Sequence, residues 1–195
     1  MRFGIRSVSM DDIANDLGMS KKTLYQYYAD KDELVAAVVD LHITKMEQDC
    51  GGCRHKSADP VHEVFLIMEQ SLEQFTNINP MVLHDLEKFH FKAYQRFKEH
   101  KDKFLYRIVK ENIDWGIKEG YYREDVNAEV MTRFRIESML IPFNIQAFPP
   151  AKFTILETSR QMLENFVYGL STLKGHKQIQ KYNQRRIKKQ NHENR

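Results

Sequence analysis

The sequence has few of the features that mark exported, disulfide-linked or membrane-spanning proteins. It contains two cysteines in 195 residues, which fits a reducing compartment better than a disulfide framework. Its apolar runs stop short of the roughly 18 residues that a membrane-spanning helix needs. Its first residues show no basic segment followed by an apolar one, as a signal peptide would. We therefore expect a cytoplasmic protein with no membrane partner.

The sequence also lacks the motifs of common enzyme classes. It has no Gly-rich phosphate loop, no HExxH motif and no Ser-His-Asp signature, and its eight histidines are scattered. Cys50 and Cys53 have the spacing of half a zinc site, but no second such pair follows. We interpret them as free thiols in a loop, with a thiol-based redox sensor and adventitious metal binding as the alternatives. The sequence thus predicts no enzyme, no cofactor and no metal site.

Strand-like alternation and internal repeats are absent, and only five prolines and eight glycines interrupt the chain. The content of 42% hydrophobic and 29% charged residues suits a helical protein with a buried core. We therefore expect an all-α fold. Beyond the first 30 residues, helical spacing of apolar side chains predicts helices over Lys31 to about Met46, Val61–Phe75, Met81–Phe89, Phe91–Glu119, Val130–Ile145 (kinked or ended by Pro142) and Ile155–Leu173.

Positive charge is distributed unevenly along the chain. The formal net charge is +3, but the segment from Lys174 onward carries eight lysines and arginines against Glu193 alone, a balance of +7. The preceding part therefore sums to −4. Few apolar residues follow Gly175, so we interpret residues 176–195 as a basic, polar, solubilising tail. The alternative is a disordered arm that binds anions.

The stretch from Ser9 to Leu34 predicts two short helices joined by a tight turn. Met10, Ile13, Ala14 and Leu17 form the apolar stripe of the first helix, and Ser9 with Asp12 forms a capping box before it. Gly18 suits a left-handed helix end, because only glycine adopts that conformation at little cost. Ser20 then caps a second helix from Lys21 to about Tyr28, and Asp30 with Glu33 opens a third at Lys31. This is the helix-turn-helix pattern.

In such a motif the second helix lies in the major groove of DNA. Lys21 and Lys22 can donate to guanine or phosphate, and the methyl group of Thr23 can touch a thymine methyl. Gln26 can pair with adenine, and Tyr25 and Tyr27 lie on or near the same outward surface. Leu24 and Tyr28 should face the core. The candidate DNA-binding residues are Ser9, Ser20, Lys21, Lys22, Thr23, Tyr25, Gln26, Tyr27 and Lys31.

The same stretch resembles the DNA-binding signature of TetR/AcrR-type repressors. The matching residues are Met10 to Ala14, Leu17-Gly18, Ser20 to Tyr25 and Lys31 to Leu34, whereas Tyr28 stands where a Phe is usual. Members of this family carry a full helix before the motif, which is largely missing here. Either the native chain starts upstream of Met1 or the domain lacks its covering helix. The resemblance implies a double-stranded DNA operator as partner, with phosphate contacts from Ser9, Tyr27 and Lys31.

The resemblance also implies that the rest of the chain binds a small effector and forms a homodimer. Family bodies enclose an apolar pocket, for which aromatic and methionine side chains are suitable walls. An unknown small apolar or amphipathic effector is therefore expected. Its candidate contacts are Phe65, Met68, Phe89, Tyr94, Asn112, Trp115 and Phe134. The last two predicted helices are apolar over more than one face, as a dimer interface would require.

The sequence therefore predicts a small helix-turn-helix head on a larger helical body. We divide the chain into a DNA-binding head with a linking helix (1–46), an effector-binding and dimerisation domain (47–175) and the basic tail (176–195). The predicted function is a homodimeric transcriptional regulator, a repressor released from a palindromic operator by its effector. The alternatives are a helical small-molecule-binding protein without DNA binding and a regulator that responds to oxidation of Cys50 and Cys53.

Overall fold

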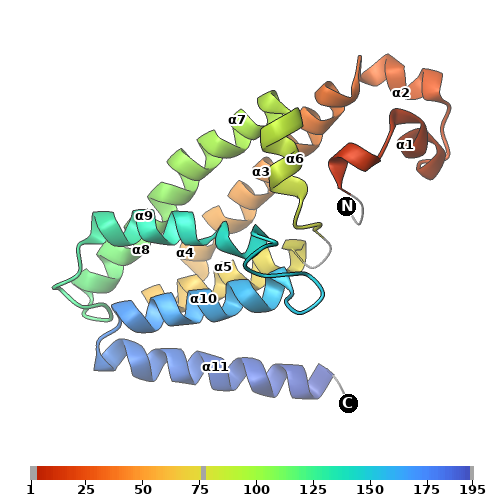
Figure 1. The fold of residues 1–195 in the computed structure, drawn as a ribbon. Coiled ribbons are helices and arrows are strands. Elements are labelled where there is room, and N and C mark those ends of the chain that lie inside the picture. The colour runs from red at the N-terminus through yellow and green to blue at the C-terminus, as the bar shows by residue number, and fades with distance from the viewer. Residues whose placement is uncertain (1–3, 76–77, 194–195) are drawn as a thin grey trace.

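The computed structural model describes residues 4–75 and 78–193, with side chains for residues 4–70 and 78–186. The described chain is helical, apart from connecting segments and one isolated bridge that pairs Tyr122 with Ser171 (Figure 1). This confirms the all-α prediction. The helices are η1 (Ile5–Ser7), α1 (Met10–Asp16), α2 (Lys21–Tyr27), α3 (Lys31–Gly51), α4 (Cys53–Lys56), α5 (Pro60–Phe75), α6 (Val82–Phe89), α7 (Phe91–Glu99), the π-helix η2 (His100–Leu105), α8 (Tyr106–Lys118), α9 (Ala128–Ser138), η3 (Ile141–Phe143), α10 (Ile155–Leu170) and α11 (Leu173–Glu193).

The molecule is elongated, with a small head at one end and a layered body at the other. Helices α1 and α2 form the head, and α3 runs from the head into the body (Figure 1). Helix α11 lies at the end of the body opposite to the head (Figure 1). In the described part of the chain, no helix is both long and apolar enough to cross a bilayer.

Three clusters of buried side chains hold these parts together. The head has its own small core of Met10, Ala14 and Leu24. A second cluster joins α3, α6 and α7 to the segment before the head, through Ile5, Val35, Leu86 and Ala93. The body core is larger and takes side chains from α5, α8, α10 and α11 and from the turn after α8: Val61, Phe65, Met68, Ile113, Tyr122, Leu163, Val167, Leu170, Ile179 and Tyr182.

Helix α3 belongs to two of these clusters at once. Leu34 packs on the head core, while the next residue, Val35, is buried in the second cluster. Neighbouring residues on a helix point in different directions, so a single turn of α3 contacts both the head and the body. The helix continues beyond Met46, where we expected it to end, as far as Gly51.

The predicted long helix from Phe91 to Glu119 is interrupted. Residues His100–Leu105 form a π-helical segment between α7 and α8. Such a segment inserts one extra residue into a helix and is invisible to apolar spacing over a longer window. The predicted end at Gly120 is confirmed, since this residue has a φ of 70°.

The C-terminal segment differs from the polar tail that we expected. Residues Leu173–Glu193 form helix α11, and Ile179 and Tyr182 on this helix are buried in the body core. Tyr182 donates a hydrogen bond to the buried carboxylate of Asp59 at 2.8 Å. Two large side chains three residues apart lie on the same face of a helix, and here they dock a helix whose overall composition is very polar. The side chains of residues 187–195 lie outside the described part.

Candidate DNA-binding head

The first helix of the head begins and ends where its local sequence directs. Ser9 forms a complete capping box with Asp12: the Ser9 hydroxyl accepts from the Asp12 amide, and the Asp12 carboxylate accepts from the Ser9 amide at 2.8 Å. The Ser9 hydroxyl also donates to the Asp12 carboxylate at 2.6 Å, and this bond together with the one from the Ser9 amide lowers the pKa of Asp12. At the other end Gly18 has a φ of 65°, so the chain reverses sharply before α2. The turn therefore needs a glycine.

The second helix is fixed against the first by its inner face. The Ser20 hydroxyl accepts from the Thr23 amide at 3.0 Å and caps α2. Leu24 is 3% exposed and packs on Met10 and Ala14, and Tyr28 lies partly buried beside them. Both inward predictions are confirmed. This packing determines which side of α2 faces outward.

The outward side of α2 carries most of the candidate DNA contacts. Tyr27 is 72% exposed and Tyr25 is 42% exposed, and Lys22 and Gln26 are also exposed. Lys21 is exposed but has a partner, since its ammonium lies 2.7 Å from a carboxylate oxygen of Asp11. The structure therefore places Lys22, Gln26 and Tyr27 where they can reach a DNA groove without giving up an ion pair.

An open hollow of about 390 Å³ lies beside α1 and α2. It brings together four of the residues singled out from the sequence, Ser9, Lys21, Tyr25 and Lys31, with Arg6. The ammonium of Lys31 also donates to the Arg6 carbonyl at 3.5 Å. Arg6 precedes the motif, and no local pattern links it to α2. Only the packing of the N-terminal segment identifies it as part of this cationic surface.

Most acidic side chains of the head are engaged locally. Asp12 and Asp30 cap α1 and α3, and the Glu33 carboxylate accepts from the Ala29 amide at 2.6 Å. Asp32 lies 2.6 Å from the ring nitrogen of His90, the residue between α6 and α7. A carboxylate that accepts from helix amides neutralises part of the helix dipole and repels phosphate less than a free carboxylate would. The head can therefore approach DNA despite its many acidic residues.

Comparison with known proteins bears out this interpretation of the head. Residues 1–38 match the family model described as "Bacterial regulatory proteins, tetR family". An uncharacterized HTH-type transcriptional regulator of Bacillus subtilis strain 168, YvaF, is 35% identical over 92 residues, which cover 45% of this chain and 47% of YvaF. The match thus spans about half the length of that relative. Residues 1–38 thus match the DNA-binding region of the TetR family of regulators.

The fold of the whole chain is similar to that of solved transcriptional regulators. The HTH-type transcriptional repressor KstR2 of Mycobacterium tuberculosis is 23% identical over 134 residues, 67% of each chain. The solved structure of KstR2 covers 86% of this chain and 87% of its own, with a TM-score of 0.62 and 19% identity. A TetR transcription regulator from Haloarcula marismortui has a TM-score of 0.68 at 21% identity and covers 85% of this chain and 88% of its own.

The head is held to the body by the segment before α1. Ile5 is 8% exposed and packs in the α3–α6–α7 cluster. The buried carboxylate of Asp85 on α6 accepts from the Arg6 amide at 3.1 Å. The guanidinium of Arg6 lies 5.0 Å from the centre of the Phe89 ring, also on α6. A displacement of α6 would therefore move Arg6 and the edge of the hollow.

The predicted effector contacts do not line one common cavity in this conformation. Phe65 and Met68 are buried in the body core, beside a cavity of about 10 Å³ that has room for about one water molecule. Phe89 lies at the junction with the head, and Tyr94 packs on the second cluster. Phe134 is 56% exposed on the outer side of α9. Only Phe65 and Met68 are neighbours in the body core.

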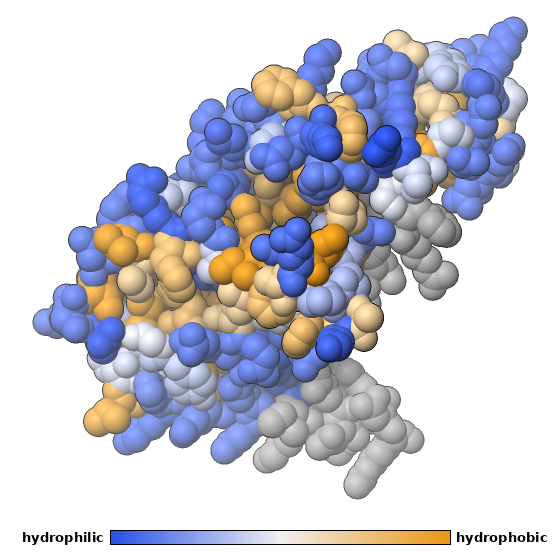
Figure 2. All heavy atoms as spheres, viewed as in Figure 1, coloured by the Kyte–Doolittle hydropathy of each residue, from blue (hydrophilic) through white to orange (hydrophobic). Residues whose placement is uncertain are grey.

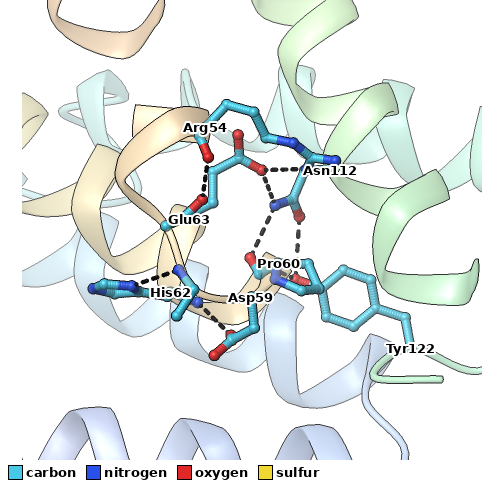
Figure 3. Close-up of polar contacts among 9 residues, drawn as sticks. Arg54, Asp59, Pro60, His62, Glu63, Asn112 and Tyr122 are labelled. Carbon is cyan, nitrogen blue, oxygen red and sulfur yellow. Dashed lines mark hydrogen bonds and ion pairs between the residues drawn. The ribbon is translucent and has the colours of Figure 1, made fainter. Parts of the chain in front are cut away.

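Asn112 lies in a polar cluster where α4, α5 and α8 meet (Figure 3), and Trp115 contacts this cluster through Arg54. The Asn112 amide donates to a Glu63 carboxylate oxygen at 2.7 Å and to the Pro60 carbonyl at 2.9 Å, and accepts from Tyr122 at 3.1 Å. The guanidinium of Arg54 pairs with Glu63 at 3.2 Å and lies 3.4 Å from the centre of the Trp115 ring. These bonds occupy the polar atoms that a ligand would need. The cluster fastens the start of α5 to α8.

The cysteines lie where α3 and α4 meet, and both are buried free thiols. The thiol of Cys53 donates to the Gln70 side chain at 3.0 Å. Burial raises the pKa of Cys50 to about 11 and also raises the pKa of Cys53. Reactive cysteines are exposed and have lowered pKa values, so this environment favours structural thiols. Among the described residues, no group of three or more His, Cys, Asp or Glu side chains could hold a metal ion.

Proposed function

We propose that this protein is a homodimeric repressor of the TetR family that binds a palindromic operator and is released by a small effector. The observation that carries the proposal is the head: its inner face is fixed by Leu24, while Lys22, Gln26 and Tyr27 point outward without internal partners in the described part. Since its partner is chromosomal DNA, the protein acts in the cytoplasm. Two heads about one helical turn of DNA apart, roughly 34–36 Å, fit two half-sites of a palindrome.

The apolar surface of the body supports the dimer. Large hydrophobic side chains are exposed along α9 and the segment that leads to α10: Val130, Phe134, Ile141, Ile145 and Phe153. Figure 2 shows hydrophobic side chains gathered over this part of the body. Exposed apolar patches of this kind mark interaction surfaces. A second copy of the chain that packs here would hold the two heads in one assembly.

Helix α3 is the proposed lever between effector and DNA. Three pairs join it along its length to α7 and the π-segment: Asp32 with His90 at 2.6 Å, Asp40 with Arg96 at 2.8 Å, and Glu47 with His100 at 2.9 Å. A shift of α7 would therefore carry α3 and change the separation of the two heads. An effector that prefers the shifted body lowers operator affinity by the same factor by which operator lowers effector affinity.

The proposed effector site lies in the body core next to Phe65 and Met68. The cavity there is about 10 Å³, so an effector of drug size has to push α5 and α10 apart to enter. This requirement ties effector binding to a change in helix packing, as the lever mechanism needs. Methionine is unbranched and adapts to a new neighbour more readily than other apolar side chains, so Met68 is suited to such a wall.

The test is a genomic DNA pull-down with the purified chain, followed by affinity measurement on the enriched sequence. We expect enrichment of a palindrome. The variants Lys22→Ala and Tyr27→Ala should each weaken operator binding about 10-fold or more, because both subunits lose a contact worth about 1 kcal/mol or more. Dimerisation, measured by analytical ultracentrifugation, should stay unchanged.

Lys45→Ala serves as the matched control, because Lys45 is an exposed lysine on α3 outside the head. Its operator affinity should equal that of the wild type. Wild-type affinity in both head variants would show that α2 is not the recognition helix. If no sequence is enriched, the protein is a helical ligand-binding protein rather than a repressor.

A further inference from the structure

Helix α11 has one face buried in the body and an opposite face that is strongly cationic. Lys174, Lys177, Lys181 and Arg185 are all exposed, and their spacing of three or four residues puts them on one side of the helix. Ile179 and Tyr182, on the other side, are buried in the body core. No Asp or Glu precedes Glu193 in this helix. The cationic row is therefore a fixed surface, since the buried side determines its orientation.

The row differs from those cations elsewhere in the molecule that pair with a carboxylate in their own helix. Lys110 pairs with Asp114, and Arg133 pairs with Glu129, both within one helix turn. By contrast, Lys177, Lys181 and Arg185 have no carboxylate within ion-pair distance in the described part of the chain. Their mutual repulsion is uncompensated within the protein, and a polyanion would relieve it.

Lys174 at the start of the row is already engaged. Its ammonium donates to the Glu119 carbonyl at 2.7 Å and lies 4.0 Å from the centre of the Tyr121 ring. The available cations are therefore Lys177, Lys181 and Arg185, at successive steps of four residues. Each step spans about 6 Å along the helix axis. Gln180 and Gln184 lie between them, are also exposed, and can donate to phosphate oxygens.

We propose that this face of α11 binds the phosphate backbone of a second segment of double-stranded DNA, without reading its sequence. Helix α11 lies at the end of the body opposite to α1 and α2, so the segment in question is distinct from the one under the heads (Figure 1). A dimer can then hold its operator through the heads and bridge to another duplex through the body. Up to residue 186, where the described side chains end, the outward face carries no large apolar side chain beyond Leu173 at its start. A membrane-bound helix needs an apolar face to insert.

The experiment uses the full chain with disabled heads (Lys22→Ala and Tyr27→Ala) and a labelled duplex that contains no operator. Affinity is measured between 50 and 200 mM salt. Each phosphate contact contributes about 0.9 to the slope of log K against log salt, so Lys177→Gln/Lys181→Gln/Arg185→Gln should reduce the slope by about 2.7. Between 50 and 200 mM salt the affinity of both proteins falls, and the factor by which it falls should be about 40 times smaller for the variant than for its parent. Glutamine maintains helix propensity, so the fold of α11 is preserved.

Lys45→Gln/Lys98→Gln/Lys103→Gln is the matched control, because it removes three exposed charges from the middle of the body. It should leave the slope unchanged. Equal slopes in the α11 variant and its parent, or equal losses in both triple variants, would overturn the proposal. The proposal would also be overturned if the α11 variant lost binding to phosphatidylserine vesicles while its DNA binding stayed unchanged. Operator binding by intact heads tests the repressor proposal separately, so either idea can fail while the other stands.

Discussion

Replacement of Asn112 should destabilise the body strongly, because this side chain joins α5 and α8 through three buried hydrogen bonds. In Asn112→Ala, Glu63 keeps only Arg54 as a partner, and the Tyr122 hydroxyl keeps only the Pro60 carbonyl at 3.4 Å. A bond to a charged group contributes about 1.5–3 kcal/mol and each neutral bond about 0.5–1.5 kcal/mol. With the remaining partners taken into account, we expect a loss of about 3–4 kcal/mol in the free energy of unfolding.

The free energy of unfolding is measured by urea unfolding monitored by circular dichroism, and the Tm is measured by thermal unfolding of the same samples. For a chain of this length the expected loss corresponds to a fall in Tm of about 10 °C. Asn15→Ala is the control, since Asn15 is an exposed residue of helix α1 and the substitution should change stability little. A loss below about 1 kcal/mol in Asn112→Ala would refute the idea that this cluster holds α5 to α8.

Asn112→Asp separates the effect of charge from that of shape. The new carboxylate would lie next to the buried carboxylate of Glu63, with which Asn112 now bonds at 2.7 Å. Burial and like charge raise the pKa of such a group in the folded state. The stability of the Asn112→Asp variant should therefore be greatest below the ordinary aspartate pKa and should fall as the pH rises through the raised pKa of the new carboxyl group. A wild-type pH dependence in this variant would contradict the proposed arrangement.

Three further predictions concern packing, the thiols and the dimer. Gly116→Ala should lower the free energy of unfolding by at least about 1–3 kcal/mol, because the added Cβ would lie 2.0 Å from the buried Tyr122 ring. The control Gly51→Ala should not destabilise the protein, because its Cβ would meet nothing within 4 Å. The pKa of the Cys50 thiol is raised from 9.0 to about 11, so at pH 8 this thiol should react with a thiol reagent about 100-fold more slowly in the folded than in the unfolded protein. Equal rates in the two states would support the alternative of a redox-responsive regulator. Phe134→Glu should shift the protein toward monomer in analytical ultracentrifugation. The control Phe91→Glu, at a residue 69% exposed on α7, should leave the dimer intact. An unchanged dimer in Phe134→Glu would show that the α9 face is not part of the interface.

The sequence alone determined the head, because its signals act within a few residues. The capping box at Ser9, the N-cap at Ser20 and the positive φ at Gly18 each depend on neighbours no more than four positions away. Apolar spacing likewise located the body helices, since each buries one face against the others. These features could be predicted because the interactions that fix them are local or periodic.

Only the tertiary structure decided which polar and aromatic side chains meet. Asn112 looked suited to a pocket, but it is used by Glu63 on another helix, 49 residues away in the sequence. The apparent polar tail became helix α11 because Tyr182 reaches Asp59, which lies 123 residues away. Arg6 lies in the hollow beside Lys21 and Lys31, and Asp85 on α6 holds its backbone there. Such contacts depend on how whole helices pack, and no periodicity within one segment encodes them.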